Sequence, residues 1–492
     1  MLFTEPTFLF LFLPILLALY FATFSREHGA YGNGLLLVAS VIFYAKGGGA
    51  FTWLMLGSIT FNYWMAIAVD RGRASGRAKA ILAMAIAVNL VVLGVFKYAN
   101  FFADNVNTLF LLLHVQPVIV PRVLLPIGIS FFTFHAISYV VDVYRRDATA
   151  QKSPVHAALY LLLFPQLIAG PIIRYRDLAD QLAKRIVTLD DFAEGVRRFI
   201  VGLAKKVLIA NVVAGPADRI FALPFPQLSA AHAWLGLVCY TLQIYFDFSG
   251  YSDMAIGLGR MFGFRFPENF RWPYIADSVQ DFWRRWHISL STWFRDYLYV
   301  PLGGNRVSPA RTYGNLVAVF FLCGLWHGAS WNFVIWGLFH GTFLVIERAV
   351  SHRGVQLSRA AGPASRHAGR AARPVLQSAA LHVYTLLVVM VGWVFFRADT
   401  LPGAIAFLKA MAGLAPGVAT PFTVQFYLTP ELWLALVAGA IGSIPWVPAL
   451  ARDRESSWGL GLAGTAALVL LFGASILQMA ARTYNPFIYF RF

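Results

Sequence analysis

The chain has 492 residues, of which 59% are hydrophobic and 13% are charged, and its mean hydropathy is +0.64. A soluble chain of this length would divide into about two or three domains, whereas this composition indicates that the bilayer is the solvent. Nucleic-acid binding would require a basic patch on a folded surface, but the net charge of +17 is spread over the gaps between hydrophobic segments. We therefore expect one membrane domain over residues 1–492.

Apolar runs that approach the ~20 residues needed to cross hydrocarbon recur from end to end of the chain. They cover roughly residues 8–24, 51–69, 80–96, 124–143, 233–258, 331–347, 378–396, 430–450 and 458–479. The first run has no basic region before it and no cleavage site after it, so we expect it to be retained as a span. The fold class predicted is all-α and polytopic, with about 11–13 transmembrane or re-entrant helices.

Lysine and arginine are unevenly distributed between alternate loops. If the N-terminus is placed outside, the loops on the inner side carry 30 of the 40 Lys and Arg, and the opposite side with its span edges carries 8. This asymmetry is typical of the positive-inside pattern. We therefore predict that the basic loops are cytoplasmic and that the N-terminus is periplasmic.

Segment 156–173 is apolar but is followed by another strongly basic stretch, which a full crossing would place outside. We predict that this segment enters and leaves the membrane on the cytoplasmic side. Pro165, Gly170 and Pro171 would break its helix, and its irregular backbone would be buried in protein or line a water-filled cavity. The alternative is a tilted span followed by an atypical loop.

The longest polar insertion, 259–313, contains an amphipathic pattern. At about 100° per residue, eight apolar residues fall within one arc and four charged residues fall outside it. The apolar set is Phe282, Trp283, Trp286, Leu290, Trp293, Phe294, Tyr297 and Leu298. We predict an amphipathic helix on the cytoplasmic face. His287 lies inside the arc, either as a packing residue or at the inner mouth of a cavity.

A second insertion, 348–378, is rich in Arg, Ala, Gly and Ser. We predict a flexible basic linker whose charges contact anionic lipid head groups.

Two polar clusters lie inside otherwise apolar stretches, where ionisable groups are expensive and point to function. The first runs from Gln243 to Asp253. Asp247 and Tyr251 are four residues apart and would share a helical face, whereas Asp253 would not. This cluster is either part of a substrate site or a satisfied polar network that fixes helix packing.

The second cluster runs from Cys323 to Asn332 and contains His327 between two apolar segments. A neutral imidazole suits proton abstraction from a hydroxyl near neutral pH, and the glycine beside it permits close approach of a substrate. The alternative is a histidine that only packs between helices. Cys323 is a candidate nucleophile, but buried cysteine more often acts as a small hydrophobe. With Cys239 it forms neither a disulfide framework nor a zinc spacing, so we expect no bound metal.

Seven motifs in this order resemble the membrane-bound O-acyltransferases, specifically the branch that contains the membrane subunit of alginate O-acetylation. The resemblance covers nearly the whole chain. The motifs are Leu125 to Phe131, Pro165 to Pro171, Gln243 to Asp253, Asp281 to Leu290, Tyr299 to Asn305, Gly324 to Gly328 and Val394 to Ala398.

The resemblance implies a funnel-like membrane enzyme of the bacterial inner membrane, with His327 and His287 as its catalytic positions. An acyl thioester, acetyl-CoA or an acyl-carrier protein, would reach His327 from the cytoplasm, and no cofactor would be tightly bound. The acceptor would be a hydroxyl of an exported polysaccharide, such as alginate, acetylated cellulose or peptidoglycan. Transfer would be direct or relayed through a periplasmic SGNH-type acetylase partner. The expected substrate-binding residues are Gln243, Tyr245, Asp247, Tyr251, Asp253, Trp283, Trp286, Trp326 and Asn332.

Three alternatives remain at this point. Within the same class, the chain could transfer D-alanine to teichoic acid from a carrier protein. From a different class, it could be a transporter of a lipid-linked substrate, since deep polar residues and a re-entrant segment suit that role too. A purely structural role in a secretion complex would predict that His287 and His327 tolerate substitution.

Overall fold

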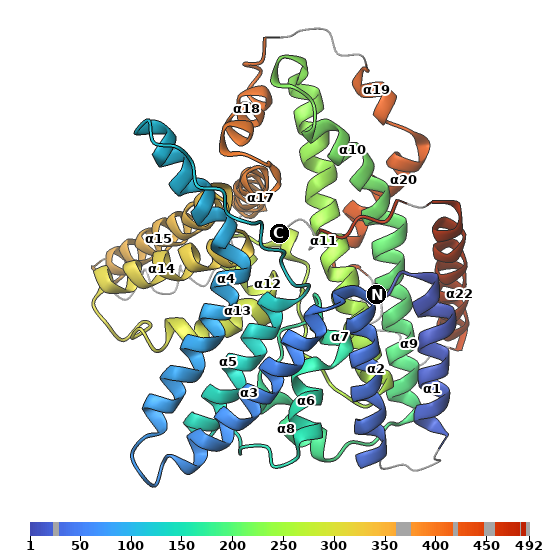
Figure 1. Cartoon of the computed structure of the whole chain (residues 1–492). Helices are drawn as coiled ribbons and strands as arrows, with labels where there is room; N and C mark the ends of the chain where they lie inside the picture. Colours follow the sequence, from blue (N-terminus) through green and yellow to red (C-terminus); the bar gives the residue numbers. More distant parts are fainter. Residues whose placement is uncertain (23–28, 361–374, 417–421, 447–457, 483, 489–492) are drawn as a thin grey trace.

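The computed structural model describes residues 1–492 except 23–28, 361–374, 417–421, 447–457, 483 and 489–492 (Figure 1). Within those ranges the chain forms helices joined by turns and loops, with no β-strand element. Six described helices are long and apolar enough to cross a membrane. They are Phe51–Arg71, Ala78–Leu112, Leu189–Phe221, Trp331–Val350, Leu376–Arg397 and Gly461–Ala481. The expected all-α, polytopic class is confirmed.

The N-terminal part packs as a row of helices. Their bounds are η1 (Phe8–Phe12), α1 (Leu13–Phe21), α2 (Ala30–Gly48), α3 (Phe51–Arg71), α4 (Ala78–Leu112) and α5 (Ile129–Arg145). Only α4 projects well beyond its neighbours, at the upper left of Figure 1. The chain that returns from its tip is held along α4 by two asparagines. The side chain of Asn107 makes two hydrogen bonds with the backbone of Val118, and Asn100 makes two with Val123.

The middle of the chain contains the long, mostly buried helix α11 (Ala230–Met261) and its neighbours. These are α9 (Leu189–Ala204), η2 (Lys205–Ala210) and α10 (Asn211–Phe221), which form one continuous rod. This rod is not among the predicted apolar runs, because Arg197, Arg198 and two lysines interrupt its hydropathy.

Two pairs of glycines bring α9 and α11 into close contact. A Cβ on Gly202 would lie 2.6 Å from the carbonyl oxygen of Gly250, and one on Gly250 would lie 2.7 Å from that of Gly202. Gly195 and Gly257 are paired in the same reciprocal way, with the corresponding distances 2.7 and 2.6 Å. Small residues that let two backbones approach are the usual basis of helix association in membranes.

Segment 156–173 is interrupted as the sequence predicts. It forms α6 (Pro154–Leu162) and α7 (Phe164–Leu167), and the chain continues into α8 (Tyr175–Ala183). The two ends of this segment adjoin: the Tyr175 hydroxyl donates to the carbonyl of Thr149 at 3.0 Å, and Arg176 pairs with Asp147 at 2.9 Å. The segment therefore enters and leaves on one side of the molecule; that this side is cytoplasmic stays a prediction.

The backbone freed by these breaks has protein partners. Phe164 N–H donates to Ser40 Oγ, Ile172 N–H to Ser289 Oγ and Ile173 N–H to His135 Nε2, at 3.1, 3.0 and 3.2 Å. At the break, a Cβ on Gly170 would lie 2.5 Å from the Cα of Gln166.

The predicted amphipathic helix of the 259–313 insertion is not one helix. It is divided into α12 (Val279–Arg285), α13 (Ile288–Phe294) and η5 (Arg295–Tyr299). The break falls at His287, whose backbone is left-handed with φ 43° and ψ 54°. Six of the eight arc residues are buried in the protein core, and Tyr297 and Leu298 are partly buried against it, so the arc stays packed inside the protein despite the break.

The C-terminal part consists of α14 (Pro309–His327), α15 (Trp331–Ala360), α17 (Val375–Arg397), α18 (Leu401–Met411), α19 (Val424–Tyr427), α20 (Pro430–Gly442) and α22 (Trp458–Ala481). Because α15 extends to Ala360, the first part of the predicted linker 348–378 is helical. Residues 361–374 of that linker lie outside the described residues.

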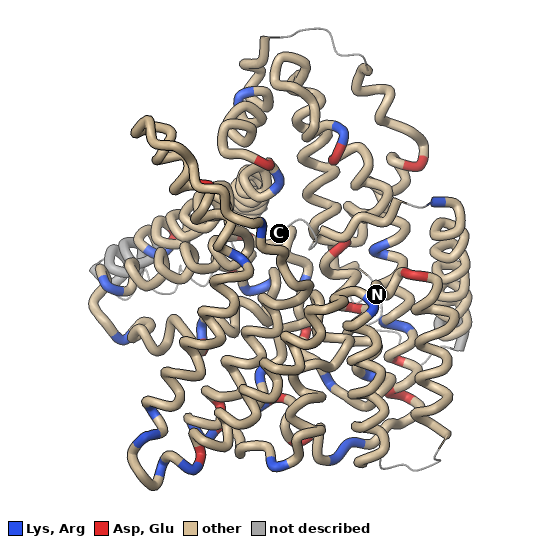
Figure 2. Tube along the Cα trace, viewed as in Figure 1, with Lys and Arg blue, Asp and Glu red and all other residues tan. Residues whose placement is uncertain are grey.

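Figure 2 shows Lys and Arg gathered at the lower end of the molecule, around α8 and the turn between α3 and α4, with fewer at the opposite end. At the lower end, Asp296 of η5 accepts hydrogen bonds from Arg174, Arg176 and Arg295 at 2.5, 3.0 and 2.8 Å. This cluster joins the re-entrant segment to η5.

The first prediction concerns the glycine contact between α9 and α11. Gly202→Ala should lower the free energy of unfolding by about 1–3 kcal/mol, because the new methyl group overlaps the Gly250 carbonyl. Thermal unfolding of the purified protein in detergent measures this as a lower midpoint. Gly57→Ala in α3 is the control, since a Cβ there meets nothing within 4 Å. An equal effect of the two substitutions would contradict the packing argument.

The second prediction concerns Asp296. Burial would raise the pKa of its carboxyl, but the hydrogen bonds and charges of Arg295 and Arg174 outweigh burial and hold that pKa below its ordinary value. A carboxyl with a lowered pKa stabilises the fold above its ordinary pKa and loses this effect as pH falls through the folded-state pKa. Asp296→Asn should therefore lower the unfolding midpoint at neutral pH, and the difference from wild type should begin to shrink as the pH falls below about 4 and vanish only below the folded-state pKa. A pH-independent difference would refute this.

Candidate active site

His327 is the last residue of α14, at the turn between α14 and α15. The two helices cross closely because a Cβ on Gly324 or Gly337 would overlap a carbonyl oxygen of the other helix. Gly328 ends α14 in an extended conformation, with φ −164° and ψ 150°, and α15 begins three residues later. This tight helical hairpin places the histidine in the interior rather than on an exposed loop.

Three aromatic rings enclose the imidazole of His327 edge to face. The ring centroids of Trp326, Trp336 and Phe396 lie 4.8, 5.0 and 5.1 Å from that of the imidazole. The residue is 8% exposed. Within the part of the chain that the structure describes, no hydrogen bond to the imidazole is present. The ring nitrogens are therefore available to a bound hydroxyl.

A small void of about 20 Å³ adjoins the ring. It has room for a single water molecule. Its walls are Ile244, Phe248, Trp286, His327, Trp336, Trp393, Phe396 and Ile488.

His287 lies close to the same chamber from the side of α13. Its ring packs edge to face on Phe248, 4.6 Å between centroids, and lies 6.4 Å from Trp326. Trp326 therefore contacts the rings of both histidines. His287 is completely buried, and its left-handed backbone directs the ring inward at the break between α12 and α13.

Asn269 fixes the tautomer of His287. Its Oδ1 accepts from the Ser289 backbone N–H at 3.2 Å and lies 3.1 Å from His287 Nδ1. Because an atom that accepts from an N–H must be the oxygen, the Nδ1 of His287 must be the protonated nitrogen. Asn269 was not among the predicted site residues, since nothing in its sequence surroundings marks it.

The structure brings four predicted aromatic residues to this chamber. Trp286 lines the void, and Tyr245 packs on it at 6.2 Å between centroids. Trp283 packs against Trp336 at 5.7 Å, and Trp326 touches His327 directly. Gln243 is buried nearby on α11, with no partner within the described ranges for its side-chain oxygen.

The two predicted carboxylates form ion pairs with basic residues of a neighbouring helix. Asp253 pairs with Arg198 at 2.8 Å and with Lys205 at 2.6 Å, and Asp247 pairs with Lys206 at 2.7 Å. These contacts join α11 to the rod formed by α9 and η2, which agrees with the packing alternative.

Two further predicted residues make packing contacts. The ring of Tyr251 stacks on Phe3 at 4.5 Å, and Asn332 donates to the carbonyl of Ala398. A substrate role for these residues, and for Asp247 and Asp253, stays a prediction.

The C-terminal segment also reaches the chamber, which the sequence did not indicate. The Ile488 N–H donates to Asp247 Oδ2 at 2.8 Å, and Phe487 packs on Tyr251 at 5.0 Å. Ile488 thereby forms part of the wall of the void beside His327.

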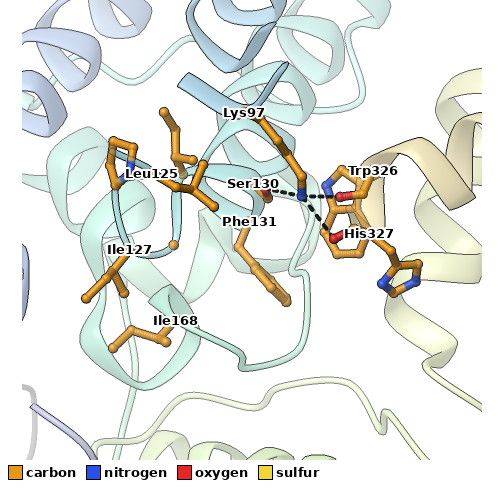
Figure 3. A pocket seen from close by; sticks show the side chains of 11 residues that line it. Lys97, Leu125, Ile127, Ser130, Phe131, Ile168, Trp326 and His327 are labelled. Carbon is orange, nitrogen blue, oxygen red and sulfur yellow. Dashed lines mark hydrogen bonds between the residues drawn. The ribbon is translucent and has the colours of Figure 1, made fainter. Parts of the chain in front are cut away.

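A larger cavity of about 160 Å³ lies on the other side of the His327 turn (Figure 3). Figure 3 shows the imidazole pointing away from it, while the backbone carbonyls of Trp326 and His327 face Lys97. The cavity is lined by Lys97, residues 125–131, Ile168, Trp326 and His327.

Comparison with known proteins identifies the family of the chain. The family model of MBOAT, the membrane-bound O-acyltransferase family, matches residues 95–369, a range that contains both histidines and Lys97. The chain belongs to this family and is a multi-pass membrane O-acyltransferase.

Its relatives include proteins of three named activities. A protein of Azotobacter vinelandii named probable alginate O-acetylase is 43% identical over the full length of both chains. The peptidoglycan O-acetyltransferase of Helicobacter pylori is 36% identical over 84% of this chain and 80% of its own. The teichoic acid D-alanyltransferase of Bacillus subtilis is 30% identical over 47% of this chain and 61% of its own.

A substitution of Asn269 tests whether this residue selects the tautomer of His287. Asn269→Ala removes the acceptor that selects the Nδ1–H tautomer, so acyl transfer should fall by about tenfold or more if His287 acts in proton transfer. The acyl content of the product, per amount of membrane-inserted enzyme, measures this. Asn305→Ala is a control, because Asn305 is exposed and its side chain accepts a hydrogen bond from the Tyr299 hydroxyl, away from both histidines. Unchanged transfer by the Asn269 variant would show that this tautomer is irrelevant to turnover.

Proposed function

We propose that the chain moves an acetyl group from a cytoplasmic thioester to a hydroxyl on the outer side of the bacterial inner membrane. The donor is acetyl-CoA or an acyl-carrier thioester. The acceptor is an exported polysaccharide of the alginate kind, or a periplasmic SGNH-type acetylase that passes the group on. The N-terminus and the outer ends of the helices face the periplasm.

The observation that carries this proposal is the imidazole of His327, enclosed by aromatic rings and without a hydrogen-bond partner in the described structure. In the reaction, a nitrogen of His327 takes the proton of the acceptor hydroxyl, and the oxygen attacks the thioester carbonyl. The carbon–sulfur bond then breaks, and the thiolate leaves and recovers a proton from the imidazolium. General base assistance of this kind contributes roughly 10²–10⁴-fold to the rate.

The choice of acetyl over other acyl groups rests on the relatives. The match to the alginate O-acetylase of A. vinelandii covers the full chain at 43% identity, whereas the match to the D-alanyltransferase of B. subtilis covers 47% of the chain at 30%. Acetylation is therefore favoured over D-alanylation. Membership of an acyltransferase family argues against a transporter of lipid-linked substrates.

The fourth prediction tests His327. His327→Ala should reduce acetylation of the exported polymer by about 10²-fold or more, because the general base is lost, while insertion and stability change little. The measurement is the ester-linked acetate of polymer from cells in which the variant is the only copy of the protein.

His114→Asn is the matched control. His114 lies on an exposed turn with φ 56°, a backbone conformation that asparagine tolerates, and should retain full activity. Normal acetylation by inserted His327→Ala protein would refute the proposed mechanism.

A further inference from the structure

The last turn of α14 is held by two neighbouring side chains of α4. The hydroxyl of Tyr98 donates to the carbonyl of Leu325 at 2.7 Å, and the ammonium of Lys97 donates to the carbonyls of Trp326 and His327, the latter at 3.3 Å. Three consecutive carbonyls, the last being that of His327, are therefore bound by residues more than 200 positions earlier in the chain.

These carbonyls need such partners for a physical reason. The last four backbone carbonyls of a helix receive no hydrogen bond from an N–H of that helix, and hydrocarbon contains no water that could donate one. The helix also carries a partial negative charge at this end, which a cation stabilises. The α14 terminus lies in the interior, so its carbonyls must be satisfied by the protein.

Lys97 differs from the other lysines in the protein interior. Lys205 and Lys206 each pair with an aspartate, whereas Lys97 has no carboxylate partner in the described ranges of the chain. Its remaining contact is with Ser130 Oγ at 3.2 Å, and its Nζ lies 5.6 Å from the centroid of the Trp326 ring. Every polar contact of the ammonium therefore belongs to the α14 terminus or to the first turn of α5.

We propose that Lys97, assisted by Tyr98, is a positioning residue that sets the location of the His327 imidazole by clamping the end of α14. The clamp rests on the proposed role of His327 as general base. Lys97 does not touch the imidazole, which points away from it (Figure 3). It acts through the backbone of Trp326 and His327, and a displacement of about 1 Å at a reacting group can reduce turnover ~10²-fold.

The cavity beside Lys97 makes a specific experiment possible. Lys97→Ala removes the amine next to an existing space of about 160 Å³, so a small alkylammonium ion has room to occupy the vacated position. Permeabilised cells with the variant as their only copy retain any partners, and radiolabelled acetyl-CoA serves as the donor probe. We expect the maximal rate of polymer acetylation to fall about 10²-fold, with the KM for the donor unchanged.

Propylammonium should then raise the acetylation rate of the Lys97→Ala variant at least tenfold, whereas neutral propanol should leave this rate unchanged. A lysine that served only folding would not respond to an added amine in protein that is already inserted. Lys409→Ala, which removes an exposed lysine of α18, is the matched control and should act as wild type with or without amine.

Two further variants distinguish a failure of the clamp from a failure of the proposed role of His327. Tyr98→Phe removes a single hydrogen bond to Leu325 and should lower the rate by about three- to tenfold, which tests the clamp if Lys97→Ala does not insert. His327→Ala should be inactive and unresponsive to propylammonium.

Full activity of His327→Ala would overturn the proposed function itself. If His327→Ala is inactive but Lys97→Ala keeps a rate within threefold of wild type, the proposal that Lys97 positions the imidazole is wrong. A raised donor KM without amine rescue would also overturn it, because Lys97 would then bind substrate. If Lys97→Ala does not insert but Tyr98→Phe does, an unchanged rate for Tyr98→Phe would overturn the clamp proposal.

Discussion

The arrangement of this enzyme depends on one constraint: a backbone amide or carbonyl inside hydrocarbon must find its hydrogen-bond partner within the protein. At two described helix ends in the interior, side chains from distant segments supply the missing partners. Lys97 and Tyr98 do so for the end of α14. Ser40 does so for the break between α6 and α7. Polar side chains placed opposite these two breaks therefore make the broken helices possible.

The same contacts connect the breaks to the two histidines. Ser289 accepts the N–H of Ile172 from the re-entrant segment and donates to Asn269 at 2.9 Å. Asn269 in turn fixes the tautomer of His287. The end of α14 carries His327, and Trp326 lies against both imidazoles. The irregular backbone is therefore the framework that brings His327 and His287, the two candidate catalytic residues, to one chamber.

The sequence predicts the class and part of this site. Hydrophobic runs with basic loops give the polytopic membrane fold, and Pro165 with Gly170 marks the re-entrant break. The importance of His327 and His287 follows from a family resemblance, because periodicity alone leaves packing and catalysis open for each.

Other features could not be predicted, for identifiable reasons. The apolar residues keep a helical period in the sequence on both sides of His287. The pattern therefore gives no sign that the helix is broken there by a left-handed residue. The partners of Asp247 and Asp253 lie on another helix about 40–55 positions away, so local spacing cannot reveal them. Lys97 resembles a charge at the edge of a span until the end of α14 is seen beside it.

The size of the void at His327 limits what can reach the imidazole in this structure. A space of about 20 Å³ holds one water molecule and is too small for an acetyl group. On the mechanism proposed above, lining side chains such as Trp286, Trp336 and Phe396 would have to rotate before an acyl donor met the imidazole. Such an aromatic gate would confine wasteful hydrolysis of the donor to the intervals when it is open.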